Sequence, residues 1–176
     1  MNDMQRKTIE DWIDKASIQL QAAREHLKSF HQSSEAIQAA QQCIELSVKS
    51  ILSLLHVKYP RAHEWPADKE PFAVIARQIR ERKLLEKLAS QHLDHAVPLA
   101  RLLFLMNFWG EFYLTAKYGF EVEHLASAQQ LFKSEEAKLA VQHAEECCRA
   151  ASALRCHDRD KLSALLSVAK KYNPIS

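Results

Sequence analysis

The chain has few of the residues that interrupt helices. Two glycines, Gly110 and Gly119, and five prolines occur among 176 residues, whereas 47% of the residues are hydrophobic. Sheet proteins need many tight turns rich in glycine and proline, so this balance favours long helices. Glycine-rich phosphate loops and Gly-x-Ser-x-Gly nucleophile elbows are excluded, because the chain lacks the glycines that these motifs require.

The chain also lacks long apolar runs and a strong net charge. No apolar run reaches about 18 residues, and residues 1–7 hold no signal-peptide core, so we expect a soluble, cytoplasmic protein without membrane contact. The 24 basic and 22 acidic residues give a net charge of +2, so any basic surface must be local. The four cysteines are too few for a disulfide framework and are expected to be buried thiols.

Apolar residues recur at helical spacing along most of the chain. A first helix is predicted over residues 8–30, with Thr8 and Asp11 as its capping box, and a second over residues 34–56. The second helix is apolar around much of its circumference, which makes it the expected centre of a bundle. Further helices are predicted over residues 72–89, which a break near Lys83 could divide, 98–118, 134–154 and 158–171.

Two segments are predicted to connect these helices. Residues 57–71 contain three of the five prolines and are expected to form an ordered loop. Gly119 is expected to end the fourth helix, before a connecting segment over residues 120–132. We therefore expect an all-α, single-domain, up-and-down bundle of four to five long helices over residues 8–156, with a short C-terminal helix and tail over residues 157–176 packed on it.

A polar stripe on the second helix gives the best local indication of a site. Gln42, Glu45 and Lys49 lie at positions i, i+3 and i+7, so their side chains share one stripe of an otherwise apolar helix. Polar groups on a core helix must find partners or face a groove. The stripe therefore has two interpretations, a ligand-binding groove or a satisfied internal network.

Metal sites gain little support from the sequence. A di-iron bundle needs two Glu-x-x-His pairs, whereas one pair, Glu121 and His124, occurs, and it falls in the predicted connecting segment. His143 and Cys147 are one helical turn apart, but the clustered cysteine spacing typical of zinc sites is missing. We expect no metal and no cofactor.

Two groups of basic residues could contact phosphate. The run 77–87 places three cations on one helical face, although a solvated face is the commoner meaning of such a run. Lys117 and His124 lie on either side of Gly119. Histidine is suited to acid/base chemistry near neutral pH, and lysine can stabilise the negative charge that develops on a phosphate.

The order of these features resembles that of the HEPN family in its stand-alone prokaryotic form, a helical family linked to nucleotides and RNA. The family's second helix reads like Gln-Ala-x-Glu-Lys-x-x-Lys. Gln42, Glu45 and Lys49 stand at the matching places, while Cys43 and Leu46 replace the alanine and the first lysine.

Further matches follow over residues 12–154. Trp12 matches the tryptophan of the family's first helix, and His63 matches a histidine in the loop after the second. Lys117 and Tyr118 stand where the family has an Arg-Tyr-Pro-like tail. The resemblance implies a bundle of four or five helices, often dimeric, with a groove near the end of the fourth helix.

The resemblance also implies a range of functions. Many members of the family are RNases or toxins that use an arginine followed, after four to six residues, by a histidine, whereas others work beside a minimal nucleotidyltransferase or only bind. Here Lys117 and His124 are separated by six residues, so lysine replaces the arginine and keeps the charge without the bidentate fork.

Three hypotheses follow from the sequence. The first is a metal-independent RNase in which His124 is the acid/base group and Lys117 the electrostatic stabiliser. The second is a purely structural, dimerising interaction domain. The third, which we favour, is a homodimeric module that binds a nucleotide, RNA or a partner nucleotidyltransferase through Gln42, Glu45, Lys49, His63, Lys117 and Tyr118.

Overall fold

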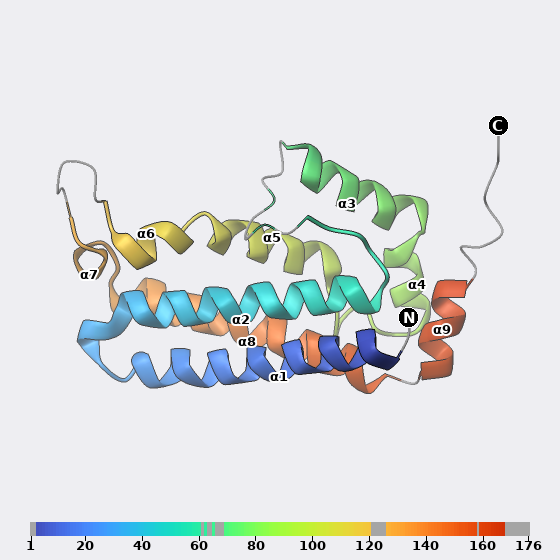
Figure 1. Ribbon diagram of the computed structural model, residues 1–176, viewed down its shortest axis with the longest axis horizontal. Coiled ribbons are helices and arrows are strands. Elements are labelled where there is room, and N and C mark those ends of the chain that lie inside the picture. Colours follow the sequence, from blue (N-terminus) through green and yellow to red (C-terminus); the bar gives the residue numbers. More distant parts are fainter. Residues whose placement is uncertain are drawn as a thin grey trace.

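Three long helices form the body of the molecule. The computed structural model describes residues 3–60, 62, 65, 69–120, 126–157 and 159–167. Within these residues the fold is all-α, and the long helices are α1 (Asp3–His26), α2 (Ser33–Leu54) and α8 (Ser134–Cys156). They run up and down beside one another, with α1 and α8 both packed on α2 (Figure 1).

Shorter helices complete the bundle on the other side of α2. Its remaining face meets α5 (Leu99–Gly110) and α6 (Tyr113–Tyr118), so α2 is the central helix, as predicted (Figure 1). None of the described helices has the length and apolar character needed to cross a membrane. The other elements are the 3-10 turn η1 (Phe30–Gln32), α3 (Glu70–Glu81), α4 (Leu84–Ser90), α7 (Ala128–Leu131) and α9 (Arg159–Ser167).

Small side chains dominate the junction of α1, α2 and α8. The Sγ atom of Cys43 on α2 lies 3.6 Å from the backbone oxygen of Ala144 on α8, which shows how closely these two helices approach. A larger residue at such a position would overpack the core, which typically costs about 1–3 kcal/mol. Fully buried small residues on these three helices include Ala16, Ala23, Ala36, Ala40, Cys43, Ala140, Ala144 and Ala151.

The first predicted helix differs from the observed one at both ends. α1 begins at Asp3 and ends at His26, rather than running from residue 8 to 30. The predicted capping box was wrong, because Thr8 lies inside the helix and its hydroxyl donates a hydrogen bond of 3.1 Å to the backbone oxygen of Met4. Ser and Thr side chains can bond backward in this way within a helix.

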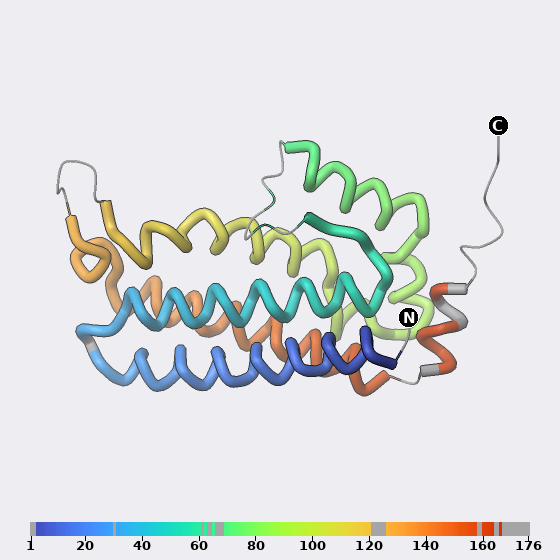
Figure 2. Tube along the Cα trace, in the orientation of Figure 1, coloured from blue at the N-terminus to red at the C-terminus, as the bar shows by residue number. Residues whose placement is uncertain are grey.

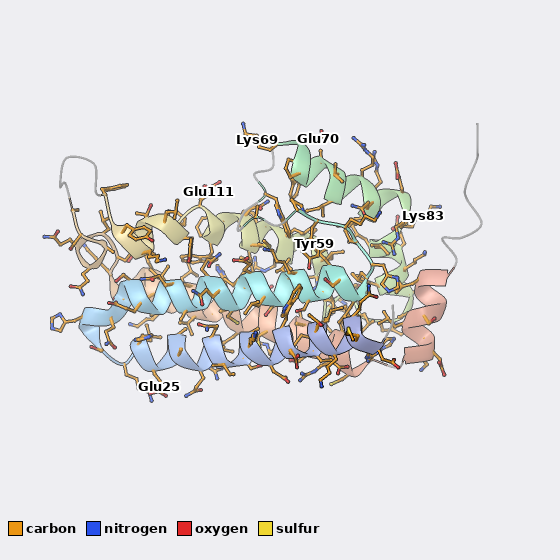
Figure 3. The ribbon with its side chains drawn as sticks, in the orientation of Figure 1. Glu25, Tyr59, Lys69, Glu70, Lys83 and Glu111 are labelled. Carbon is orange, nitrogen blue, oxygen red and sulfur yellow. The ribbon has the colours of Figure 1, made fainter. Side chains whose placement is uncertain are left out.

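The third and fourth predicted helices are each divided in the structure. The break expected near Lys83 is confirmed: this residue has φ +51 and separates α3 from α4. The single helix predicted over residues 98–118 was wrong, because α5 ends at Gly110 and α6 begins at Tyr113. Glycine is the weakest helix former after proline, and here it directly precedes the break. Glu111, at this break, points away from α2 (Figure 3).

The predictions for Gly119, for the four cysteines and for the C-terminal helix can also be compared with the structure. Gly119 ends α6 with φ +71, which confirms it as the helix terminator. Cys43, Cys147 and Cys148 are buried free thiols, as predicted, whereas Cys156 is exposed and the prediction for it was wrong. A C-terminal helix was predicted over residues 158–171, and the structure has α9 at Arg159–Ser167. Residues 158 and 168–171 lie outside the described residues.

Candidate functional site

A row of polar side chains on α2 faces α5 and α6. Its members, Gln38, Gln41, Glu45 and Lys49, are spaced by three or four residues and therefore share one helical face. The Gln38 amide donates a hydrogen bond of 2.9 Å to the backbone oxygen of Ala116 on α6, which fixes the direction of this face. The structure thus brings together Glu45 and Lys49 as predicted, with Gln41 as a third member.

Gln42 occupies a different position from the one expected. It is half-buried, and a helical step of one residue turns it away from the line through Gln41 and Glu45. Gln41, by contrast, is almost fully buried, and its Nε2 approaches Glu45 Oε2 at 3.4 Å. Sequence reasoning missed Gln41, although its spacing of four from Glu45 was a usable signal.

Glu45 and Lys49 form the centre of this row. Lys49 Nζ donates to Glu45 Oε1 at 2.6 Å, and the two side chains are only 14% and 13% exposed, respectively. Both charges are therefore largely removed from water, where an ion pair must be well hydrogen-bonded to offset its desolvation. This arrangement is typical of an internal polar network, in which the lysine and the carboxylate bind each other.

Trp65 covers the network from the loop between α2 and α3. Lys49 Nζ lies 5.9 Å from the centroid of the Trp65 ring, within cation–π range. The Trp65 backbone N–H donates to Asn107 Oδ1 on α5 at 2.9 Å, so this tryptophan joins the loop to α5. Tyr59, labelled in Figure 3, packs on Trp65 with ring centroids 5.5 Å apart.

Two buried polar atoms of this cluster have no hydrogen-bond partner among the described residues. They are Gln41 Oε1 and Trp65 Nε1. Sequence reasoning also missed Trp65 and Asn107, and the one available signal was the asparagine inside the apolar stretch of α5. His63, which was predicted to bind a ligand, lies outside the described residues.

Lys117 and Tyr118 form a second polar group at the end of α6. Lys117 Nζ lies 5.9 Å from the centroid of the Tyr113 ring and 5.1 Å from that of Tyr118. Tyr118 is the main cause of the raised pKa of Lys117, which keeps its ammonium charged at neutral pH. Tyr118 is 49% exposed, so it presents a ring next to a positive charge on the surface.

Gly119 turns the chain sharply at this point. A side chain there would bring Cβ within 2.5 Å of the backbone oxygen of Ala126, which only glycine avoids. The Phe120 N–H donates to that same oxygen at 3.0 Å, so Phe120 and Ala126 lie next to each other at the end of α6. His124 belongs to this segment and lies outside the described residues.

The two polar groups are separated along the bundle. The hydrogen bond from Gln38 to the backbone oxygen of Ala116 places Gln38 beside α6. Lys49 lies eleven residues after Gln38 on α2. At 1.5 Å per residue this places Lys49 about 16 Å further along the helix axis. The structure therefore does not bring Lys117 and Tyr118 together with Glu45 and Lys49.

His143 on α8 is held as a neutral acceptor. Trp109 Nε1–H on α5 donates to its Nδ1 at 3.0 Å. Burial is the main cause of the lowered pKa of His143, and the positive charge of Arg101 lowers it further. The described residues contain no group of three or more His, Cys, Asp or Glu side chains that could hold a metal ion.

Comparison with known proteins yields a family match. Residues 9–154 match the family model described as HEPN domain, which covers most of the chain. No curated protein matches the chain, and no solved structure does.

We predict that removing one charge of the network destabilises the fold strongly. Lys49→Ala removes the ammonium that donates to the largely buried Glu45 carboxylate, and the expected loss is on the order of 3 kcal/mol in the free energy of unfolding. The double variant Glu45→Leu with Lys49→Met should lose less, because both charges of the pair are removed together. Urea titration measures each loss.

The matched control is the exposed pair of Glu25, in the last turn of α1, and Lys28, which follows that helix. Its atoms are 2.7 Å apart, but the side chains are 70% and 52% exposed, respectively. Lys28→Ala should therefore cost less than about 0.5 kcal/mol. Equal losses for Lys49→Ala and Lys28→Ala would show that the network is not needed for the fold.

A second prediction concerns pH. Because the folded state lowers the pKa of His143 from its ordinary 6.5, the unfolded chain binds this proton more readily. The contribution of His143 to stability is therefore present above about pH 6.5 and is lost as pH falls below it. His143→Gln keeps an acceptor for Trp109 without titrating, so its melting temperature should fall less upon acidification. An unchanged pH dependence would contradict this account.

Proposed function

This chain belongs to the HEPN domain family, and we propose that it binds single-stranded RNA or a nucleotide at the end of α6. The observation that carries the proposal is the position of the Lys117 ammonium between the Tyr113 and Tyr118 rings. A cation can contact a phosphate, while an exposed ring can stack on a base. Phe120, which is also exposed, extends the aromatic surface.

The remaining predicted binding residues have an indirect role in this proposal. Glu45 and Lys49 bind each other below Trp65, so their part is to hold α2, the loop and α5 in place. Gln42 and His63 stay candidates for ligand contact. With a net charge of only +2, affinity for RNA has to come from a local group such as Lys117.

Metal-independent RNA cleavage at the same place is the second candidate. It is favoured by the hydrogen bond from Phe120 to Ala126, because these two residues flank His124 in the sequence and Phe120 follows Lys117 by three residues. His124 would take the proton of a ribose 2′-hydroxyl, which attacks the adjacent phosphate, and Lys117 would stabilise the negative charge. The products would carry 2′,3′-cyclic phosphate and 5′-hydroxyl ends.

We also propose that a second copy of the chain covers the outer face of α5. Phe104 and Phe108 are 57% and 37% exposed and stack with ring centroids 5.9 Å apart. Exposed aromatic residues are enriched at the centres of protein interfaces. A minimal nucleotidyltransferase is the alternative partner for this face.

RNA binding is tested by fluorescence anisotropy with a labelled single-stranded RNA. Lys117→Ala should weaken binding about ten-fold and reduce the salt slope by about 1, because one phosphate contact is lost. Tyr118→Ala should weaken binding about five-fold or more without changing the slope, since stacking is not ionic. Tyr118→Phe, which keeps the ring, should bind like the wild type.

Lys69→Ala is the control for a lost surface lysine, because Lys69 lies at the start of α3, away from α6 (Figure 3). Wild-type affinity in both Lys117→Ala and Tyr118→Ala would overturn the binding proposal. The same samples, incubated in EDTA, report cleavage: the nuclease candidate requires cyclic phosphate products that disappear in His124→Ala while binding persists. Intact RNA with the wild-type protein would leave binding as the function.

The dimer is tested by light scattering coupled to size-exclusion chromatography. Phe104→Ser should shift the protein from dimer to monomer, because it removes apolar surface from the centre of the proposed interface. Leu139→Ser is the matched control, since Leu139 is a similarly exposed apolar residue on α8. A wild-type protein that is monomeric throughout would refute the proposed interface.

A further inference from the structure

A groove lies between the beginning of α1 and the end of α2. In Figure 2 these two helix ends lie at the opposite end of the bundle from α6 and α7. Its volume is about 450 Å³, which is within the usual range for small-molecule sites. Trp12 of α1 and the residues His56 and Lys58 that follow α2 are among its lining. None of these residues takes part in the network below Trp65 or in the group at Lys117.

The groove offers an apolar floor and one accessible aromatic ring. Ile9 and Val57 line it and are nearly fully buried, so they form a floor rather than a flexible rim. Trp12 is partly exposed, whereas Trp65 and Trp109 are buried in the core. A flat ring that enters the groove could therefore stack on the Trp12 indole.

Two side chains, Gln78 of α3 and Arg82 directly after it, hold the wall of the groove in a fixed conformation. Arg82 donates hydrogen bonds of 2.9 Å and 2.7 Å to the backbone oxygens of His56 and Leu55. The Gln78 amide bonds both the N–H and the backbone oxygen of Lys58, each at 2.9 Å. His56 has φ +54, a conformation that costs energy outside glycine and persists where its surroundings fix it. The wall is therefore preorganised, which lowers the cost of binding.

The local charge at the groove is positive. Among the described residues that line it, Lys58 is cationic and exposed and none is acidic. Burial lowers the pKa of His56, and the positive charge of Arg82 lowers it further. The sequence indicates that the basic run 77–87 is either a solvated surface or a contact for phosphate. In the structure, Arg82 of this run points inward and binds the backbone at the end of α2.

We propose that this groove binds a small ligand that combines a flat aromatic ring with an anionic group. The ring stacks on Trp12 above Ile9 and Val57, and the anionic group lies at Lys58. The proposal does not depend on RNA binding at α6, because the end of α2, which Lys58 follows, and α6, which contains Lys117, lie in different parts of the bundle (Figure 2).

Titration of the full chain with AMP tests the proposal by calorimetry and by tryptophan fluorescence. Quenching reports Trp12, because the other two tryptophans are buried. AMP should bind about ten-fold more tightly than adenosine, which lacks the phosphate, and than inorganic phosphate, which lacks the ring. Trp12→Leu and Lys58→Ala should each weaken AMP binding about five-fold or more.

Lys138→Ala is the control for a lost surface lysine, and it should bind AMP like the wild type. Thermal melting of each variant confirms that it is folded. Absence of AMP binding at millimolar concentration would overturn the proposal, as would affinity that survives both Trp12→Leu and Lys58→Ala. Binding that is lost in Lys117→Ala but kept in Lys58→Ala would also overturn it, and would assign AMP to the end of α6 instead.

Discussion

The close approach of α2 to α1 and α8 is the constraint on which the rest of the structure depends. The contact of Cys43 Sγ with the backbone oxygen of Ala144 leaves no room for a larger side chain between these helices. Because small residues on all three helices fill this junction, the rotation of α2 about its axis is fixed. That rotation directs the row from Gln38 to Lys49 toward α5 and α6.

The polar row is then enclosed by the elements that pack over it. Trp65 and Asn107 close the network at Lys49, while the Gln38 amide binds the backbone of α6. A charge pair that is mostly removed from water is costly to open, since each ion would lose its partner. We therefore propose that the interior of the bundle is a scaffold and that ligands bind toward its two ends.

The elements with strong local signals were predictable from the sequence. The apolar circumference of α2, the terminating role of Gly119 and the break at Lys83 all depend on neighbouring residues in the chain. The start of α1 was missed because Thr8 bonds backward to Met4 inside the helix, although its type and spacing also fit a cap. The break after Gly110 was missed because the residues on both sides continue the helical pattern.

The candidate site was predictable only in part. Glu45 and Lys49 were found because an ion pair at i, i+4 is a local feature of one helix. Gln41 was missed because polar residues stand at both 41 and 42, and only tertiary packing selects which of them turns inward. Trp65 contacts Lys49 directly and is held in place by Asn107, which is 42 residues away, and the spacing of residues along the chain does not predict such contacts.

Hydrogen–deuterium exchange with and without a saturating single-stranded RNA tests most directly whether the ends of the bundle, rather than its polar interior, meet the ligand. The account predicts new protection at residues 113–120, the end of α6, and unchanged exchange over residues 38–49 of α2. Backbone amides near a bound ligand exchange more slowly, because their local opening is suppressed. Protection of residues 38–49 with none at residues 113–120 would contradict the account. It would indicate instead that the polar row of α2 binds the ligand.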